Sequence, residues 1–270
     1  MPEQTYDYLI APKASFDATA DAIRAMTGSQ ASITWGQDGF ADAANNLGVD
    51  ILQGDAPSGK VTIVATKDIP GQAICGRRGI TDLIIDFRGG YTVTRTSIGG
   101  GNVSLINIQL IYADDNVREF AEYGISGANA VRTIVIRGYL SWLNQSGIRG
   151  NTGVTTIDFE KLGTIANNAT FYGDSSLNTL IFRRTDTITA IAGTSTTIFQ
   201  NTPFASGKAG GTLYVPASLV TDYANSTNWS TILALNANNQ IKSIESTHTD
   251  PNAPIDLTLY YADGTLIPTT

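Results

Sequence analysis

Apolar residues recur along the chain in a fixed template: an apolar residue, two free positions, an aliphatic residue, one free position and a second apolar residue. The first positions of five copies lie 23, 28, 23 and 23 residues apart, so one unit carries a five-residue insertion. No single unit can bury its apolar side alone, whereas stacked units can. The pattern therefore predicts a solenoid with one short strand per unit. The five copies are Ile80/Leu83/Ile85, Val103/Ile106/Ile108, Val131/Ile134/Ile136, Val154/Ile157/Phe159 and Leu177/Leu180/Phe182.

A second column of bulky apolar residues keeps the same register. Four of its members lie six residues ahead of a template and one, Ile98, lies five ahead. Small and polar residues fill the gaps, and Gly and Asn there are suited to tight bends. An ordinary β-sandwich is the alternative, but its strands are not usually so evenly spaced. The other members of the column are Ile74, Ile125, Ile148 and Phe171.

These repeats resemble leucine-rich repeats, and their closest resemblance is to the BspA-like repeats of bacteria. Phe171 and Leu177 have the aromatic-to-leucine spacing of that family, and the segment from Gly211 to Ser230 is similar to its closing segment. The resemblance covers roughly residues 58–245 and implies an adhesive repeat protein. The chain departs from the family where a cysteine is usual, at Arg77, Ala128, Asn151 and Asp174.

The N-terminal segment has a different pattern. Phe16, Ala20, Ile23 and Met26 follow helical spacing, and Gly28 can end that helix. The stretch Ala18–Gly28, followed by Ile33–Trp35 and Gly39–Ala43, resembles a module that precedes repeat or fibre regions in tail and baseplate proteins of phages of Gram-positive gut bacteria. The resemblance implies that this segment attaches the chain to other virion or surface proteins. A small helical cap on the solenoid is the alternative.

We accordingly expect an α+β, mostly β chain built around a leucine-rich-repeat solenoid. Residues 1–50 would form a helical attachment or assembly module, residues 51–245 the solenoid with a terminal cap, and residues 246–270 a β-like tail. In the tail, Leu257 and Leu259 alternate with polar residues as in a strand. The pattern leaves open whether the tail pairs within its own chain or with a neighbouring chain.

The amino-acid composition then limits the kinds of binding and catalysis that we expect. A net charge of −7 offers no basic surface for nucleic acid or for an anionic membrane. One cysteine, Cys75, and one histidine, His248, leave few routes to a metal centre or a catalytic triad. We expect the acidic pair Asp114 and Asp115 to lie in a solvated loop. We therefore expect no catalytic residues, no metal and no cofactor.

Surface recognition remains as the expected function. Residues between the core positions of each strand should point outward, and an extended repeat face is a common binding surface. In this register the aliphatic residues Ile84, Val135 and Ile181 would be exposed. The candidate binding residues on the face are Ile84, Asn107, Val135, Arg137, Asp158, Ile181 and Arg183.

Together these patterns predict a non-enzymatic structural or binding protein. The first hypothesis is a phage tail, baseplate or receptor-binding component that presents its repeat surface to a host glycan or protein. A start without the basic and apolar regions of a signal peptide favours a virion protein assembled in the host cytoplasm. The alternative is a bacterial cell-surface adhesin of the BspA-like type. A homo-oligomer is compatible with either hypothesis.

Overall fold

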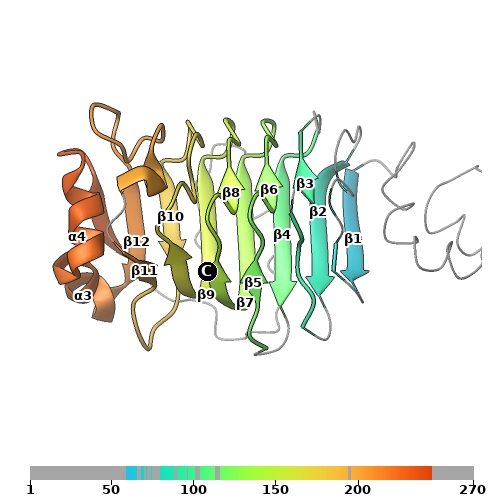
Figure 1. Ribbon diagram of the computed structural model, residues 1–270, viewed down its shortest axis with the longest axis horizontal. Coiled ribbons are helices and arrows are strands. Elements are labelled where there is room, and N and C mark those ends of the chain that lie inside the picture. Colours follow the sequence, from blue (N-terminus) through green and yellow to red (C-terminus); the bar gives the residue numbers. More distant parts are fainter. Residues whose placement is uncertain are drawn as a thin grey trace, which may run out of the picture.

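The computed structural model describes residues 59–65, 68–69, 71, 74, 80–87, 90–95, 97–100, 104–112, 116–193 and 196–244. The predictions for residues 1–50 and 246–270, for Cys75 and His248, and for Asp114 and Asp115 lie outside these residues. The described chain winds into stacked coils, with one strand of a long parallel sheet in each (Figure 1).

The main sheet follows chain order from one end of the stack to the other, and every pairing in it is parallel. Thr133 pairs with Thr156 and Thr156 with Thr179, so these coils repeat every 23 residues. Parallel neighbours need a connection that returns to the same edge of the sheet, and here the rest of each coil provides it. The strands are β1 (Gly59–Ala65), β2 (Ile80–Phe87), β4 (Asn107–Tyr112), β7 (Thr133–Leu143), β9 (Thr156–Ala166), β10 (Thr179–Phe182), β12 (Thr212–Pro216) and β13 (Gln240–Ile244).

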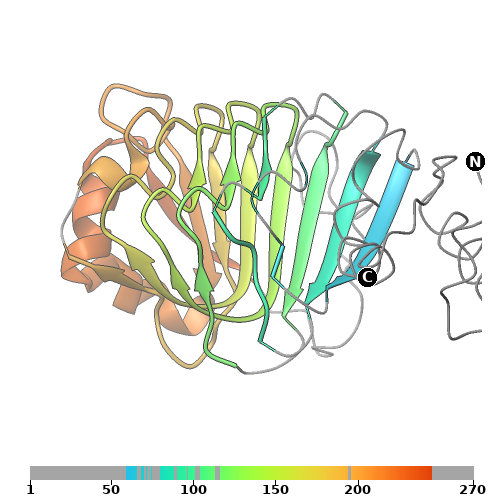
Figure 2. The same ribbon diagram turned by 45° about the vertical axis from the view of Figure 1, so that its right-hand side comes forward.

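Two further sides of the coils are also built from short parallel strands (Figure 2). β7 bends at Gly138, which has a φ of +74° and lies so close to Tyr112 that a Cβ would meet its carbonyl oxygen at 1.8 Å. After the bend, the second halves of β7 and β9 pair with β5 and β11. The remaining strands are β5 (Glu119–Phe120), β11 (Ala190–Ala192), β3 (Ile98–Gly99), β6 (Ile125–Ser126) and β8 (Ile148–Arg149), of which the last three form a sheet of their own.

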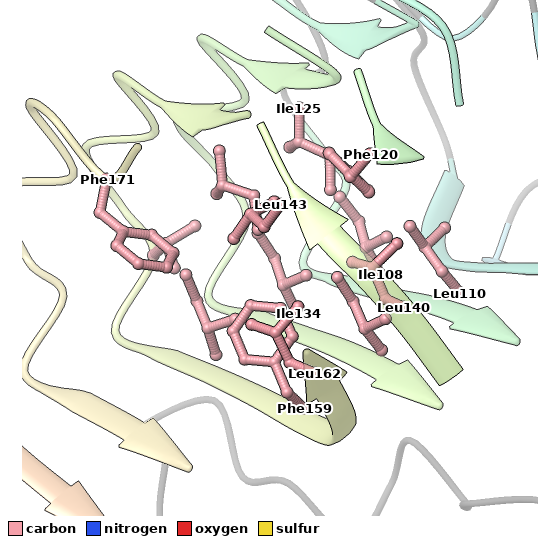
Figure 3. Close-up of a cluster of buried hydrophobic side chains, with 14 of the residues drawn as sticks. Ile108, Leu110, Phe120, Ile125, Ile134, Leu140, Leu143, Phe159, Leu162 and Phe171 are labelled. Atoms are coloured by element: carbon pink, nitrogen blue, oxygen red, sulfur yellow. The ribbon is translucent and has the colours of Figure 1, made fainter. Parts of the chain in front are cut away.

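The core fills the space enclosed by the coils. Ile134 and Phe159 enter it from the main sheet, and Leu140 and Leu162 enter it from the strands beyond the bend. Ile125 enters it from the third side, which is the sheet of β3, β6 and β8 (Figure 3). All five side chains are buried. Because equivalent residues stack from coil to coil, the core is continuous along the stack.

The C-terminal end of the stack is closed by α3 (Val220–Asn225) and α4 (Thr227–Ala234), which follow β12 and the short 3-10 helix Ala217–Leu219 (Figure 1). Trp229 of α4 packs edge-on against Phe182 with ring centroids 5.4 Å apart, and its Nε1 donates to the carbonyl oxygen of Thr189 at 2.7 Å. The hydroxyl of Tyr223 accepts a hydrogen bond from the Thr189 amide at 2.8 Å. These rings cover apolar side chains that the open end of a stack would leave in water.

The predicted fold class is wrong. The described residues are mostly parallel β-sheet, with strands on three sides of the coils, and their α-helices lie only at the C-terminal end. The described residues therefore do not form the α+β leucine-rich-repeat solenoid that we expected, while the predicted N-terminal helical module lies outside them. The reason is physical: an apolar column every 23 residues reports the length of a coil, but not how many of its sides form strands.

The template also fitted one coil in the wrong register. β2 pairs Leu83 with Ile108, and β4 pairs Ile108 with Ile134. The inward residues of this coil are therefore Leu105, Ile108 and Leu110, two positions later than the predicted triplet. Both triplets satisfy the template, and only the strand pairing distinguishes them.

Candidate functional site

The predicted binding residues lie on the side of the main sheet that points away from the core, here called the outer face. One row across this face is aligned by the strand pairing and consists of Ile84, Gln109, Val135, Asp158 and Ile181. The sheet thus brings together four of the predicted residues.

The register of the template would put Asn107 in the row of Ile84, but the strand pairing puts it in a neighbouring row, between Asp82 and Thr133. The difference follows from the two-residue shift of the template in this coil. Asn107 donates from its side-chain amide to Asp82 Oδ1 at 2.7 Å.

The exposure expected for the outer face is also wrong. Six of the seven predicted residues are buried, and the seventh, Asn107, is partly exposed. Val135 is 1% exposed and Ile181 is 0% exposed, although neither belongs to the core cluster. A large external ligand could not reach these side chains without displacing whatever covers them.

Each of the three charged residues predicted to bind a ligand, Arg137, Asp158 and Arg183, pairs with an opposite charge. Arg183 donates from Nε and Nη2 to the Asp158 carboxylate at 2.9 and 2.7 Å, and both side chains are buried. Arg137 lies 3.4 Å from Glu160, whose carboxylate also accepts from the Gly138 amide at 2.9 Å. A buried charge is tolerated when it is paired in this way. The two arginines we expected to contact a ligand therefore act within the sheet.

A different set of side chains reaches solvent at the third side of the coils, formed by β3, β6 and β8, and at the turns just before it. Arg95 is exposed, and Tyr123, Arg149 and Tyr172 are partly exposed. The guanidinium carbon of Arg95 lies 5.1 Å from the centre of the Tyr123 ring, and that of Arg149 lies 5.5 Å from Tyr123 and 4.6 Å from Tyr172. We call this alternating stack of four residues the Arg–Tyr ladder.

The coil geometry explains how the ladder forms. Tyr123 sits at a corner with a φ of +57°, and Ser146 repeats that corner one coil later with a φ of +54°. Arg149 follows in β8, and its Nη1 donates to the Tyr123 hydroxyl at 3.2 Å and to Ser146 Oγ at 3.4 Å. These contacts hold the guanidinium between the rings of Tyr123 and Tyr172.

The sequence patterns did not reveal this ladder. Its members differ in residue type and lie in three different columns of the repeat, at spacings of 28, 26 and 23 residues. A search for aromatic and basic residues at repeat spacing outside the core columns would have found Arg149 and Tyr172, which are 23 residues apart.

A second ladder of polar residues, here called the inner polar ladder, lies inside the stack and includes Asn151 and Asp174. Asn151 accepts from the Ala128 amide at 2.9 Å, and Asp174 Oδ1 accepts from the Asn151 amide at 2.7 Å. Ala128, Asn151 and Asp174 are three of the positions where BspA-like repeats usually have cysteine. Burial raises the pKa of the Asp174 carboxyl well above its usual value of 3.8. This carboxyl is fully enclosed, so it can serve the stacking of coils and cannot reach a substrate.

Within the described ranges, no cluster of three or more His, Cys, Asp or Glu side chains could hold a metal ion. The two α-helices of the described part are too short or too polar to cross a membrane. Comparison of the chain with protein-family models, with curated proteins and with solved structures gives no match in any of the three.

Proposed function

We propose that this protein is a non-enzymatic scaffold that presents the Arg–Tyr ladder to an acidic glycan of a host cell surface. The observation that supports the proposal is the alternation of flat cationic and aromatic groups on one side of a rigid stack. Aromatic faces pack against the apolar faces of sugars, and a guanidinium binds carboxylate or phosphate through two parallel hydrogen bonds.

The stacked coils favour binding over catalysis. Their paired strands hold successive coils in register, so the ladder residues are ordered before a repetitive polymer binds, which reduces the ordering cost of binding. Several weak contacts along one polymer then add to a useful affinity.

The setting of a phage tail, baseplate or receptor-binding component rests on the resemblance of residues 1–50 to a phage module. In that setting the N-terminal segment attaches the chain to other virion proteins, and the ladder faces the host. Mass spectrometry of purified phage particles and of bacterial surface fractions tests this part. Finding the chain in the surface fraction and not in particles would favour the cell-surface adhesin instead.

The binding part is tested with cell wall purified from Gram-positive bacteria, before and after extraction of its phosphate-containing polymers. We expect the Tyr172→Ala and Arg149→Gln variants to bind untreated wall at least about tenfold more weakly, a loss of about 1.4 kcal/mol. Arg184→Gln is the matched control, because it removes the same charge from an arginine that pairs with Asp186 away from the ladder. Equal binding by all three variants, or no loss after extraction, would contradict the proposal.

A further inference from the structure

The central row of the outer face is as deeply buried as the core that lies on the other side of the main sheet. Gln109 and Ile181 are 0% exposed and Val135 is 1% exposed. Among the described helices and strands, those with substantial contact to β7 and β9 are the strands that pair with them. Strand pairing covers the edges of a strand and leaves its faces open. The burial therefore requires a further layer over this face.

The covering layer is local. On β13, at the edge of the same sheet, Gln240 and Lys242 are exposed, and Tyr214 on β12 is partly exposed. Burial is deepest in the central row, at Gln109 on β4, Val135 on β7, Asp158 on β9 and Ile181 on β10, which are all 0–1% exposed. The occupant therefore crosses the middle of the sheet and leaves the β13 edge uncovered.

The chemistry of the face indicates a peptide. Ile84, Val135 and Ile181 supply apolar surface, while both polar atoms of the Gln109 amide are buried without a hydrogen-bond partner in the structure. Thr133 Oγ1, one row away, is in the same condition. A purely apolar cover would leave these groups unsatisfied, which destabilises the folded chain. An extended backbone offers a carbonyl and an N–H group side by side, which matches the amide of Gln109.

We propose that residues 245–270 of the same chain are this occupant and cross the outer face as an extended peptide. The segment begins directly after β13, at the edge of the sheet that it would cover. From β13 to β7 is four strand spacings, about 19 Å at ~4.8 Å each. Twenty-six extended residues span up to ~86 Å, so the segment is long enough several times over.

The sequence of this segment has one apolar side. Ile255, Leu257 and Leu259 alternate with Asp256 and Thr258, so an extended conformation places the aliphatic side chains together. That side matches the aliphatic residues of the outer face, and the acidic and hydroxyl side chains face water. The proposal is independent of the glycan-binding function, because the ladder lies on another part of each coil.

The first test measures thiol labelling at two adjacent positions of β7 in a Cys75→Ser background. Val135→Cys places a thiol on the outer face, and Ile134→Cys places one in the core. A buried thiol reacts only when its cover opens. In the full chain we expect both thiols to react slowly, and Val117→Cys, at a position that is 79% exposed, to react fast.

Disrupting residues 245–270 should make only the thiol on the outer face, at Val135→Cys, accessible to the label. With Leu257→Asp and Leu259→Asp, we expect Val135→Cys to label at least about tenfold faster and Ile134→Cys to stay slow. Asp256→Asn with Thr258→Ser is the matched control on the opposite side of the segment, and it should leave both rates unchanged. Unchanged labelling of Val135→Cys in the aspartate variant would overturn the proposal. So would protection that is lost on dilution, because it would identify a second copy as the cover.

The second test does not depend on how the aspartate variant folds. A photo-crosslinking residue is placed at Leu257 in the otherwise intact chain, and the products are mapped by mass spectrometry. We expect crosslinks within one chain to peptides that contain Val135, Asp158 or Ile181. Crosslinks between chains, or crosslinks only to other regions, would overturn the proposal.

Discussion

The two faces of the main sheet are both buried, yet they are built from different residues. The inner face packs Phe159 against Phe182 with ring centroids 5.5 Å apart, among aliphatic side chains. The outer face holds the ion pair of Asp158 and Arg183 and the amide of Gln109 among its aliphatic residues. Burial alone therefore does not identify the core of this protein.

The two faces differ because what lies over each face places different requirements on its side chains. The inner face fills a closed space whose volume is set by the coils, so side chains there must match in shape. The outer face is buried without a described element over it, and the tail that we propose as its cover could adjust to polar groups if they are paired. Charges are accepted on the outer face because they pair with each other at short distances, as Arg183 does with Asp158 at 2.7 Å.

The largest expected effect comes from truncating a ring of the inner face. Phe159→Ala should lower the free energy of unfolding by about 4 kcal/mol, because the coils cannot collapse around the cavity. Ile181→Ala on the outer face should cost about 2 kcal/mol, the low end for a buried aliphatic residue, since its cover can move. Urea denaturation of both variants measures the contrast. Equal losses would show that the two covers are equally rigid.

The buried ion pair should give the next effect. Arg183→Met leaves the Asp158 carboxylate without its guanidinium and should cost about 3 kcal/mol. Adding Asp158→Leu removes the charge as well, and most of that loss should be recovered. The same urea unfolding experiment measures both variants. A double variant as unstable as the single one would mean that the pair stabilises the outer face beyond neutralising its own charges.

Asp174 in the inner polar ladder should give a smaller effect that depends on pH. Since burial raises its pKa, the folded chain keeps a proton that the unfolded chain releases above its usual pKa of 3.8. Stability from this group is therefore complete below that value and is lost as the pH rises through the folded pKa.

Asp174→Asn removes this dependence. Its side-chain oxygen can still accept from the Asn151 amide, and its NH₂ can donate to the preceding coil, as Asn151 does to the Ile125 carbonyl at 3.2 Å. We expect a Tm higher by a few degrees at neutral pH and no difference near pH 3. A variant that is less stable at both pH values would contradict this account.

The smallest effect on stability should come from the Arg–Tyr ladder. Tyr172→Ala removes a cation–π contact at a partly exposed site, and we expect a loss of about 1 kcal/mol or less in urea unfolding. The same variant should show the large loss of cell-wall binding described above. A large loss of stability would mean that the ladder serves the fold instead of binding.

Much of the inward pattern could be predicted from the sequence. Ile134, Ile157 and Leu180 were placed correctly on the inward side of the strands, because alternation along a strand is a local property. The coil of Ile108 was misplaced by two residues, because two overlapping triplets satisfy the same template. The pairing partner, which lies in another coil, is what selects between them.

The candidate site was harder to predict than the core. Exposure of Val135 and Ile181 was inferred from their outward direction, but direction does not determine what lies above a face. The Arg–Tyr ladder was missed because its side chains meet only after the corners at Tyr123 and Ser146 bring different columns together.

The sequence by itself determined the coil length and the side of each well-aligned strand that faces the core. Both follow from periodicity, which neighbouring residues record directly. Only the tertiary structure decided that the coils have strands on three sides, that the outer face is covered, and that Arg149 lies between two tyrosines. Each of these depends on contacts between residues of different coils, and a repeating pattern of apolar residues is compatible with several such arrangements.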